Sequence, residues 1–219
     1  MPTPANDEFI ANLDVTIPDA SKAVVMAAEN VARFSRETGD TAVLRAYANL
    51  QFFITQVDLD IRMNLRLLLA DESSRITAEK YLALALIEAE KGIGIMLREL
   101  AVEAGKQHGR LAGFLDLKQW GEAQAAMTSR LKAMRTDKPF YKDLTQIRNE
   151  VVAHFVSKSS GVETSAQWAL SRSAVQKSGS SILNSLIVSY SVDLATGLAE
   201  LSHAMTAASA EWMKANLKR

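Results

Sequence analysis

The chain has 219 residues, 48% of them hydrophobic, with only 10 glycines and 4 prolines. This composition excludes a largely disordered chain and favours one helical domain. Basic and acidic residues are equal at 25 each, so no global positive field attracts nucleic acid, and the absence of cysteine excludes disulfides, Cys-ligated zinc and thiol catalysis.

The start of the chain carries no obvious targeting signal. Its first residues, MPTPANDEF, are neither basic nor a continuous apolar run, and no stretch of about 20 apolar residues follows. We therefore expect a cytoplasmic protein without a membrane span. No P-loop, zincin motif or Ser-His-Asp motif context is present, and we expect no cofactor and no metal.

Residues 1–18 contain three of the four prolines, which predicts an extended N-terminal arm that ends at Pro18. Residues 19–219 are then expected to form a single helical domain. Its first helix begins after Asp19 or Ser21 and closes at Gly39. The predicted inward face of this helix consists of Val24, Ala28, Val31 and Phe34.

Two long helices are expected next, one that begins at Asp40 or Thr41 and runs to Ala70, and one from Thr77 to about Ala104, because apolar residues keep the helical period in both. Gly92 and Gly94 lie inside the second of these. Phosphate-binding glycines belong between a strand and a helix, and no strand precedes these two. We expect them to allow close helix packing instead.

A fourth helix is expected from Leu117 to Arg135. Its predicted inward residues are Trp120, Met127, Leu131 and Met134. The end of this helix and the start of the next carry five basic residues against one acid, Asp137. These candidate RNA-binding residues are Arg130, Lys132, Arg135, Lys138 and Lys142, the best local patch for phosphate, with a merely solvated face as the alternative.

The next helix is predicted at about 138–156, with Asp137 as its cap and Pro139 in its first turn. Its apolar stripe consists of Phe140, Leu144, Ile147, Val151 and Phe155. A polar loop follows at 157–165, then a short helix with Trp168 and Leu170. The chain ends in a long C-terminal helix whose apolar period runs through Leu183, Leu186, Tyr190, Leu194, Leu201, Met205, Ala208 and Trp212. The whole pattern predicts an all-α antiparallel helical bundle.

Reactive side chains border the apolar stripe of the 138–156 helix. Arg148 and His154 project roughly 60° to either side of the stripe's centre, and Glu150 lies one turn before His154, where it can orient the imidazole. Arg148 ends about 120° around the helix from His154. One helix therefore cannot easily bring both onto one small group.

The string Arg148-Asn149-Glu150-Val151-Val152-Ala153-His154 resembles the signature of the HEPN superfamily, in which an Arg, often followed by a polar residue, precedes a His near the end of a helix. The resemblance covers about seven residues. It implies an all-α fold and a homodimer whose two motifs meet across the dimer. Some members carry a further polar residue on an earlier helix, for which the sequence offers no clear candidate.

Many members of that superfamily are metal-independent ribonucleases in toxin–antitoxin, abortive-infection and other defence systems. The resemblance thus implies an endoribonuclease that leaves 2′,3′-cyclic phosphate ends, with an RNA substrate and an antitoxin protein as partners. Arg148, His154 and Asn149 would be its catalytic residues, with Glu150 in support. His154 would transfer protons and Arg148 would stabilise the charged phosphorane, while Asn149 would orient the motif or the substrate.

Two other interpretations explain parts of the same pattern. Arg148 and His154 can be structural, the Arg covering apolar surface with its stem and the His favoured as a cation in the last helical turn. The chain would then be a non-catalytic helical module that binds nucleotide, RNA or protein. Glu200-x-x-His203 has a spacing found in di-iron bundles, but only one copy occurs, and both residues are expected to be exposed.

Overall fold

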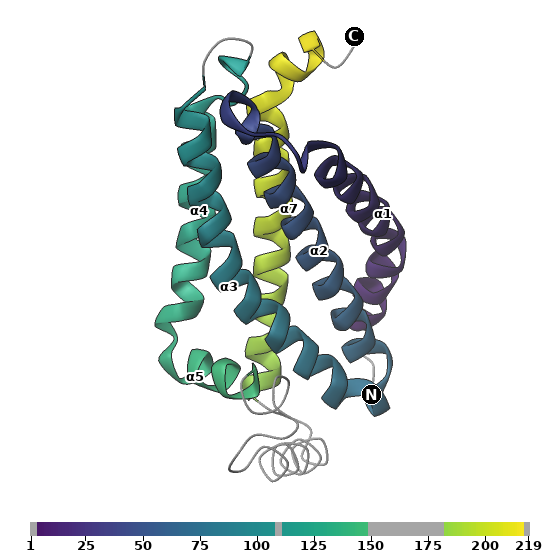
Figure 1. Ribbon diagram of the computed structural model, residues 1–219. Coiled ribbons are helices and arrows are strands. Elements are labelled where there is room, and N and C mark those ends of the chain that lie inside the picture. Colours follow the sequence, from purple (N-terminus) through teal and green to yellow (C-terminus); the bar gives the residue numbers. More distant parts are fainter. Residues whose placement is uncertain (1–3, 108–110, 149–181, 217–219) are drawn as a thin grey trace.

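The structure, a computed structural model, describes residues 4–107, 111–148 and 182–216. Within these ranges the chain forms six α-helices that pack into a bundle, and it contains no strand (Figure 1). The prediction of an all-α bundle is confirmed. None of the described helices is both long enough and apolar enough to cross a membrane.

The N-terminal segment differs from its prediction. Helix α1 runs from Pro4–Phe34, so the expected extended arm is helical over its described part and Pro18 lies inside the helix. Pro18 is solvent-exposed, while Leu13 is buried and Phe9 and Ile17 pack against the core. These apolar contacts offset the backbone hydrogen bond that an interior proline removes.

The packing of Phe9, Leu13 and Ile17 also determines which face of α1 points toward the core. Ala27 is buried and Ala28 is exposed, so the predicted face was wrong at Ala28. Helix α1 ends at Phe34, five residues before Gly39, which has a positive φ of 59° in a short 3₁₀ turn, Gly39–Thr41. Glycine adopts that conformation without steric cost.

Helices α2 (Ala42–Ala70) and α3 (Arg75–Gly105) form the central antiparallel pair, joined by a 3₁₀ turn at Glu72–Ser74 (Figure 1). Both helices match their predicted positions. A Cβ built on Gly92 would lie 2.4 Å from Cζ of Phe53 on α2, whereas one on Gly94 would meet nothing within 4 Å. Close packing is therefore confirmed at Gly92 and absent at Gly94.

Helix α4 (Leu117–Thr136) begins at an Asp116 cap and packs antiparallel to the long C-terminal helix α7 (Ile182–Asn216) (Figure 1). The four predicted inward residues of α4 are all buried. A Cβ on Gly197 would lie 2.7 Å from Cδ of Arg130, so the absence of a side chain there lets the arginine stem cross α7.

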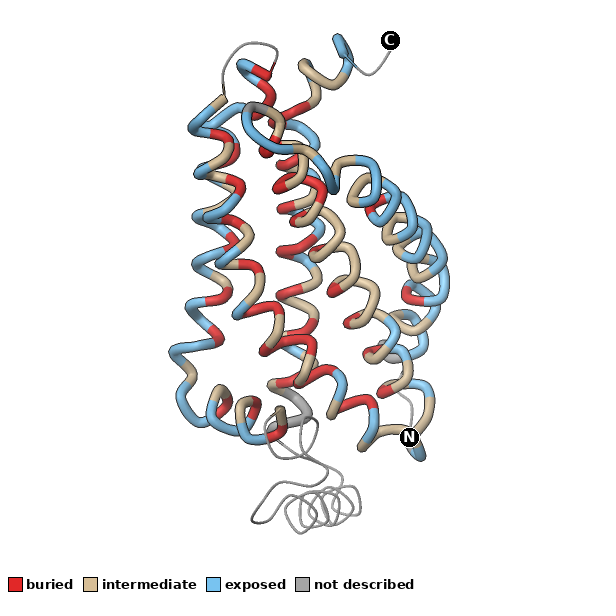
Figure 2. Tube along the Cα trace, viewed as in Figure 1, coloured by how far each residue is buried: buried red, intermediate tan, exposed pale blue. Residues whose placement is uncertain are grey.

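Helix α5 (Lys138–Gln146) lies across one end of the bundle, beneath α3 and α4 (Figure 1). Buried residues line the facing sides of α2, α3, α4 and α7, while α1 is largely exposed on its outer side (Figure 2). The core is one contiguous apolar cluster to which all six helices contribute. It holds α5, and with it the first part of the motif segment, against α3.

Candidate functional site

Helix α5 carries the first part of the predicted motif helix, and a side-chain cap fixes its start. Asp137 accepts a hydrogen bond from the backbone N–H of Phe140 at 3.3 Å, and Pro139 lies in the first turn. Both features confirm the prediction. The residues of the apolar stripe that the structure describes, Phe140, Leu144 and Ile147, are all buried.

Asp137 also attaches α5 to α7. Its Oδ2 accepts a hydrogen bond from the hydroxyl of Tyr190 at 3.2 Å, and the Tyr190 ring stacks on Phe140 with centroids 4.7 Å apart. Burial raises the pKa of Tyr190, and the hydrogen bond to the Asp137 carboxylate raises it further. The phenol therefore keeps the proton that it donates.

A buried carboxylate joins three helices at the same end of the bundle. Glu90 on α3 is only 5% exposed and forms an ion pair with Arg135 at the end of α4. Its other oxygen accepts a hydrogen bond from the hydroxyl of Tyr141 on α5 at 2.8 Å. Burial raises the pKa of Tyr141, with the bond to Glu90 contributing in the same direction. Glu90 thus fixes α5 relative to α3 and α4.

Arg148 is the first residue of the Arg–His motif, and the structure places it against α3. Its Nε donates a hydrogen bond to Oε1 of Glu88 at 2.7 Å, with side chains 34% and 44% exposed respectively. After Gln146 the helix passes into a π-helical turn at Ile147 and Arg148. Such turns recur at functional sites. Arg148 is therefore held in position and still partly open to solvent.

The other predicted catalytic and supporting residues, Asn149, Glu150 and His154, lie outside the described residues, as do Val151 and Phe155. The structure adds one residue that the sequence did not single out, Glu88. No local pattern indicates that a glutamate on the third helix pairs with an arginine 60 residues later.

The five residues of the predicted basic patch do not form one group. Arg130 makes ion pairs with Asp193 and Glu200 on α7, its Nη2 lying 2.7 Å from Glu200 Oε2. Arg135 is bound to Glu90. Both guanidinium groups therefore have carboxylate partners inside the molecule.

The three lysines of the patch differ from the two arginines. Lys132, Lys138 and Lys142 are exposed on α4 and α5 and form no ion pair with the residues that the structure describes. Their ammonium groups are accessible from solvent. Within the described part of the chain, these three of the five predicted phosphate-binding residues have no carboxylate partner.

Glu200 and His203 on α7 are both exposed, as predicted. Glu200 binds Arg130, which occupies one of its oxygens. Across the described ranges, no three side chains of His, Asp or Glu lie close enough together to hold a metal ion. Among the residues that the structure describes, Glu200 and His203 thus have none of the further ligands that a bundle metal site requires.

Comparisons of the chain with models of known protein families, with curated proteins and with solved structures give no match.

Proposed function

We propose that this protein is a metal-independent endoribonuclease of HEPN type that acts as a homodimer. The observation that carries the proposal is the position of Arg148, which Glu88 holds at the end of α5 with part of its side chain open to solvent. A catalytic arginine needs this combination of fixed orientation and access. The motif string that continues from Arg148 to His154 supplies the other half of the argument.

The proposed reaction is attack of a ribose 2′-hydroxyl on the adjacent phosphate. His154 takes the 2′-hydroxyl proton, Arg148 stabilises the charge on the phosphorane, and a second histidine protonates the leaving 5′-oxygen. The products are a 2′,3′-cyclic phosphate and a 5′-hydroxyl. Because one helix offers one His and one Arg on diverging sides, the second histidine comes from the partner motif in the dimer.

Glu88 is our candidate for the further polar residue on an earlier helix. It lies on α3 and binds Nε of Arg148, so it acts as a positioning residue through the arginine. This contact supports the proposal because a fixed guanidinium grips phosphate oxygens with less loss of rotamer freedom.

RNA phosphates are proposed to bind Lys132, Lys138 and Lys142, which are exposed and precede Arg148 in the chain. Arg130 and Arg135 are not assigned this role, because both form ion pairs with carboxylates of the protein itself. An RNA strand bound along α4 and α5 then passes the end where Arg148 lies. A role in a toxin–antitoxin or phage-defence system, with an antitoxin protein as partner, is part of the same proposal.

The second candidate function is a non-catalytic helical module that binds nucleotide, RNA or a protein. It is favoured by the ion pair between Arg148 and Glu88, since this contact joins the segment after α5 to α3 and needs no substrate to explain it. The two functions differ in whether His154 and Arg148 are required for RNA cleavage, which can be measured directly.

The test is an RNA-cleavage assay of the purified protein on long single-stranded RNA in excess EDTA. We expect cleavage that leaves cyclic phosphate ends, and a loss of about 10²- to 10⁴-fold in rate for His154→Ala and for Arg148→Ala. His203→Ala is the matched control and keeps full activity. Unchanged cleavage by both motif variants, when circular dichroism and light scattering show a folded dimer, would remove the ribonuclease proposal.

A further inference from the structure

A cleft separates α1 from α7, and α2 forms its floor. It contains two cavities of about 450 and about 510 Å³, which share Arg62, Ala199 and His203 as wall residues. Each volume lies within the range of about 300–1,000 Å³ that is usual for small-molecule sites. Neither cavity is lined by a residue of α3 or α5, which position Arg148, so the occupant of the cleft is independent of the ribonuclease proposal.

One of these cavities is apolar on most of its wall. The apolar wall consists of Phe9 and Leu13 from α1, Leu65 from α2, and Val192, Ala195 and Ala199 from α7. The two alanines leave space where larger side chains would close the gap between the helices. This part of the cleft suits an acyl chain or a ring, because apolar surface gains free energy when it leaves water.

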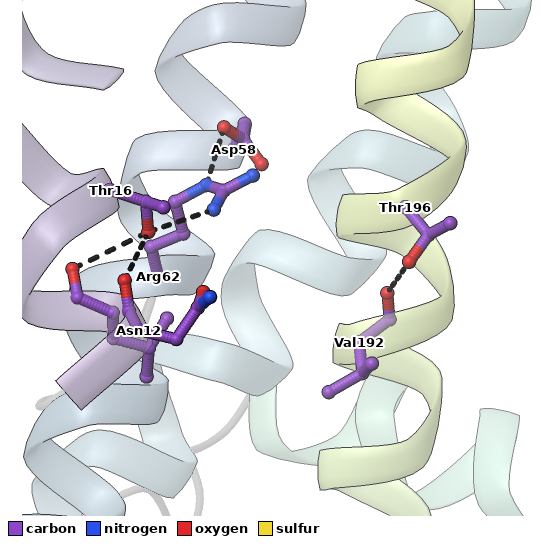
Figure 3. A network of polar contacts seen from close by, with 7 residues as sticks. Asn12, Thr16, Asp58, Arg62, Val192 and Thr196 are labelled. Atoms are coloured by element: carbon purple, nitrogen blue, oxygen red, sulfur yellow. Dashed lines mark hydrogen bonds and ion pairs between the residues drawn. The ribbon is translucent and has the colours of Figure 1, made fainter. Parts of the chain in front are cut away.

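The polar part of the wall is organised by Arg62. Its Nε donates to Asp58 Oδ2 at 2.7 Å and its Nη1 donates to Thr16 at 3.1 Å, two bonds that hold the guanidinium in one orientation (Figure 3). The side chain is 22% exposed. Its Nη2 makes no hydrogen bond within the described residues. Arg62 thus presents a fixed donor group on the wall of both cavities.

Further donors lie beside Arg62 in the apolar cavity. The side-chain amide of Asn12 makes no hydrogen bond within the part of the chain that the structure describes, and the imidazole of His203 lies on the α7 wall. Figure 3 shows Asn12 next to Arg62, with Val192 and Thr196 across the cleft on α7. The acid on this wall, Glu200, is already held by Arg130 at 2.7 Å. Donor groups from three helices, on Arg62, Asn12 and His203, therefore lie on the wall of this cavity.

We propose that this cleft binds a small amphipathic monoanion, an alkyl or aryl carboxylate whose body fills the apolar cavity and whose head accepts hydrogen bonds from Arg62, Asn12 and His203. A single negative charge fits better than two. Asp58 already places one carboxylate against Arg62, and its Oδ1 is buried without a hydrogen-bond donor among the described residues. A phosphate dianion would add a second charge beside that carboxylate.

Isothermal titration calorimetry with octanoate tests the charge requirement. Saturable binding of octanoate is expected, at least about tenfold tighter than octanol or octylamine, because a hydrogen bond to a charged group contributes about that factor. Octyl phosphate, tested near pH 8 where it is a dianion, is expected to bind more weakly than octanoate. Equal affinity for octanol, or tighter binding of the amine or the phosphate, would overturn the proposal.

Two kinds of variant then locate the site. Arg62→Gln should weaken octanoate binding at least about tenfold, while Arg66→Gln, which removes an arginine bound to Asp14 outside both cavities, should leave it unchanged. Ala195→Phe keeps Arg62 and fills the apolar cavity, so it should abolish binding even if Arg62→Gln does not fold.

Methyl NMR on the wild-type protein provides a readout that requires no substitution. Octanoate should shift the methyl signals of Leu13, Leu65 and Val192 and leave those of Leu131, buried on α4, unchanged. Binding that shifts none of the three cleft methyls, or that survives Ala195→Phe in a folded protein, would place octanoate elsewhere and refute the assignment.

Discussion

Nε of Arg148 lies 2.7 Å from Oε1 of Glu88, which joins the start of the Arg–His motif to the middle of α3. Both side chains are partly exposed, so their attraction is screened by water and contributes at most about 1 kcal/mol to stability. The same contact fixes where the guanidinium points. Its effect on an arginine-dependent activity is therefore larger than its effect on the fold.

Glu88→Gln separates these two effects. We expect the free energy of unfolding to change by less than about 1 kcal/mol, because the pair is partly exposed. The rate of RNA cleavage should fall about tenfold, because the guanidinium loses its charged orienting partner. Glu99→Gln, at an exposed position of the same helix, is the control. A rate equal to wild type would show that Glu88 does not position Arg148.

Substitution of Glu90 should affect the stability of the fold more than an arginine-dependent activity. Its carboxylate is buried and binds Arg135 and Tyr141, so Glu90→Ala leaves both partners without their acceptor. Breaking a buried pair costs about 3–5 kcal/mol, and the exposure of Arg135 reduces this to about 2 kcal/mol. Urea denaturation should show a lower midpoint with an unchanged slope. A midpoint equal to that of Glu88→Gln would contradict the role of Glu90 in fixing α5.

The Tyr141 hydrogen bond predicts a pH dependence. Because the pKa of Tyr141 is raised in the folded protein, the folded state holds this proton more tightly than the unfolded state, whose tyrosine pKa is about 10. The stabilisation is fully present below pH 10 and is lost as the pH rises through the folded pKa. Wild type should thus exceed Tyr141→Phe by about 1 kcal/mol at pH 8, and by less above pH 10. A stability difference between wild type and Tyr141→Phe that grows as the pH rises would contradict this prediction.

The glycine pair on α3 provides a matched test of helix packing. Gly92→Ala places a methyl group 2.4 Å from the Phe53 ring and should destabilise the protein by about 1–3 kcal/mol. Gly94→Ala meets open space and should stabilise it by about 0.5–1 kcal/mol, because alanine has the better helix propensity. Thermal unfolding of both variants measures the difference. Equal shifts would mean that Phe53 moves aside without loss.

The sequence predicted those parts of the fold that follow from local chemistry. The apolar period of α2, α3 and α4 and the Asp137 cap depend on neighbours within a few residues, so one chain suffices to recognise them. Pro18 misled the prediction because its local effect was outweighed by contacts of Phe9 and Leu13 with distant helices. Propensity is a weak guide where tertiary packing opposes it.

The candidate site was less predictable because its contacts are long-range. The basic patch was defined by charge density along the chain, and that density does not reveal that Arg130 faces Asp193, 63 residues later. Glu88 and Arg148 are likewise 60 residues apart in the sequence, so their pairing is not visible in it. The sequence shows which residues are charged, but the partner of each charge depends on which helix faces pack together in the folded protein.

The two ion pairs of Arg130 with α7 restrict how α4 can move along α7. Its guanidinium spans Asp193 and Glu200, seven residues and about 10 Å apart along the helix axis, while its stem crosses the gap above Gly197. A slide of α4 by one helical turn would break both ion pairs and drive the stem into a position that carries a side chain. The two ion pairs therefore fix the axial position of α4 relative to α7. Because α5 follows α4 directly, they also fix the position of Arg148 along the axis of the bundle.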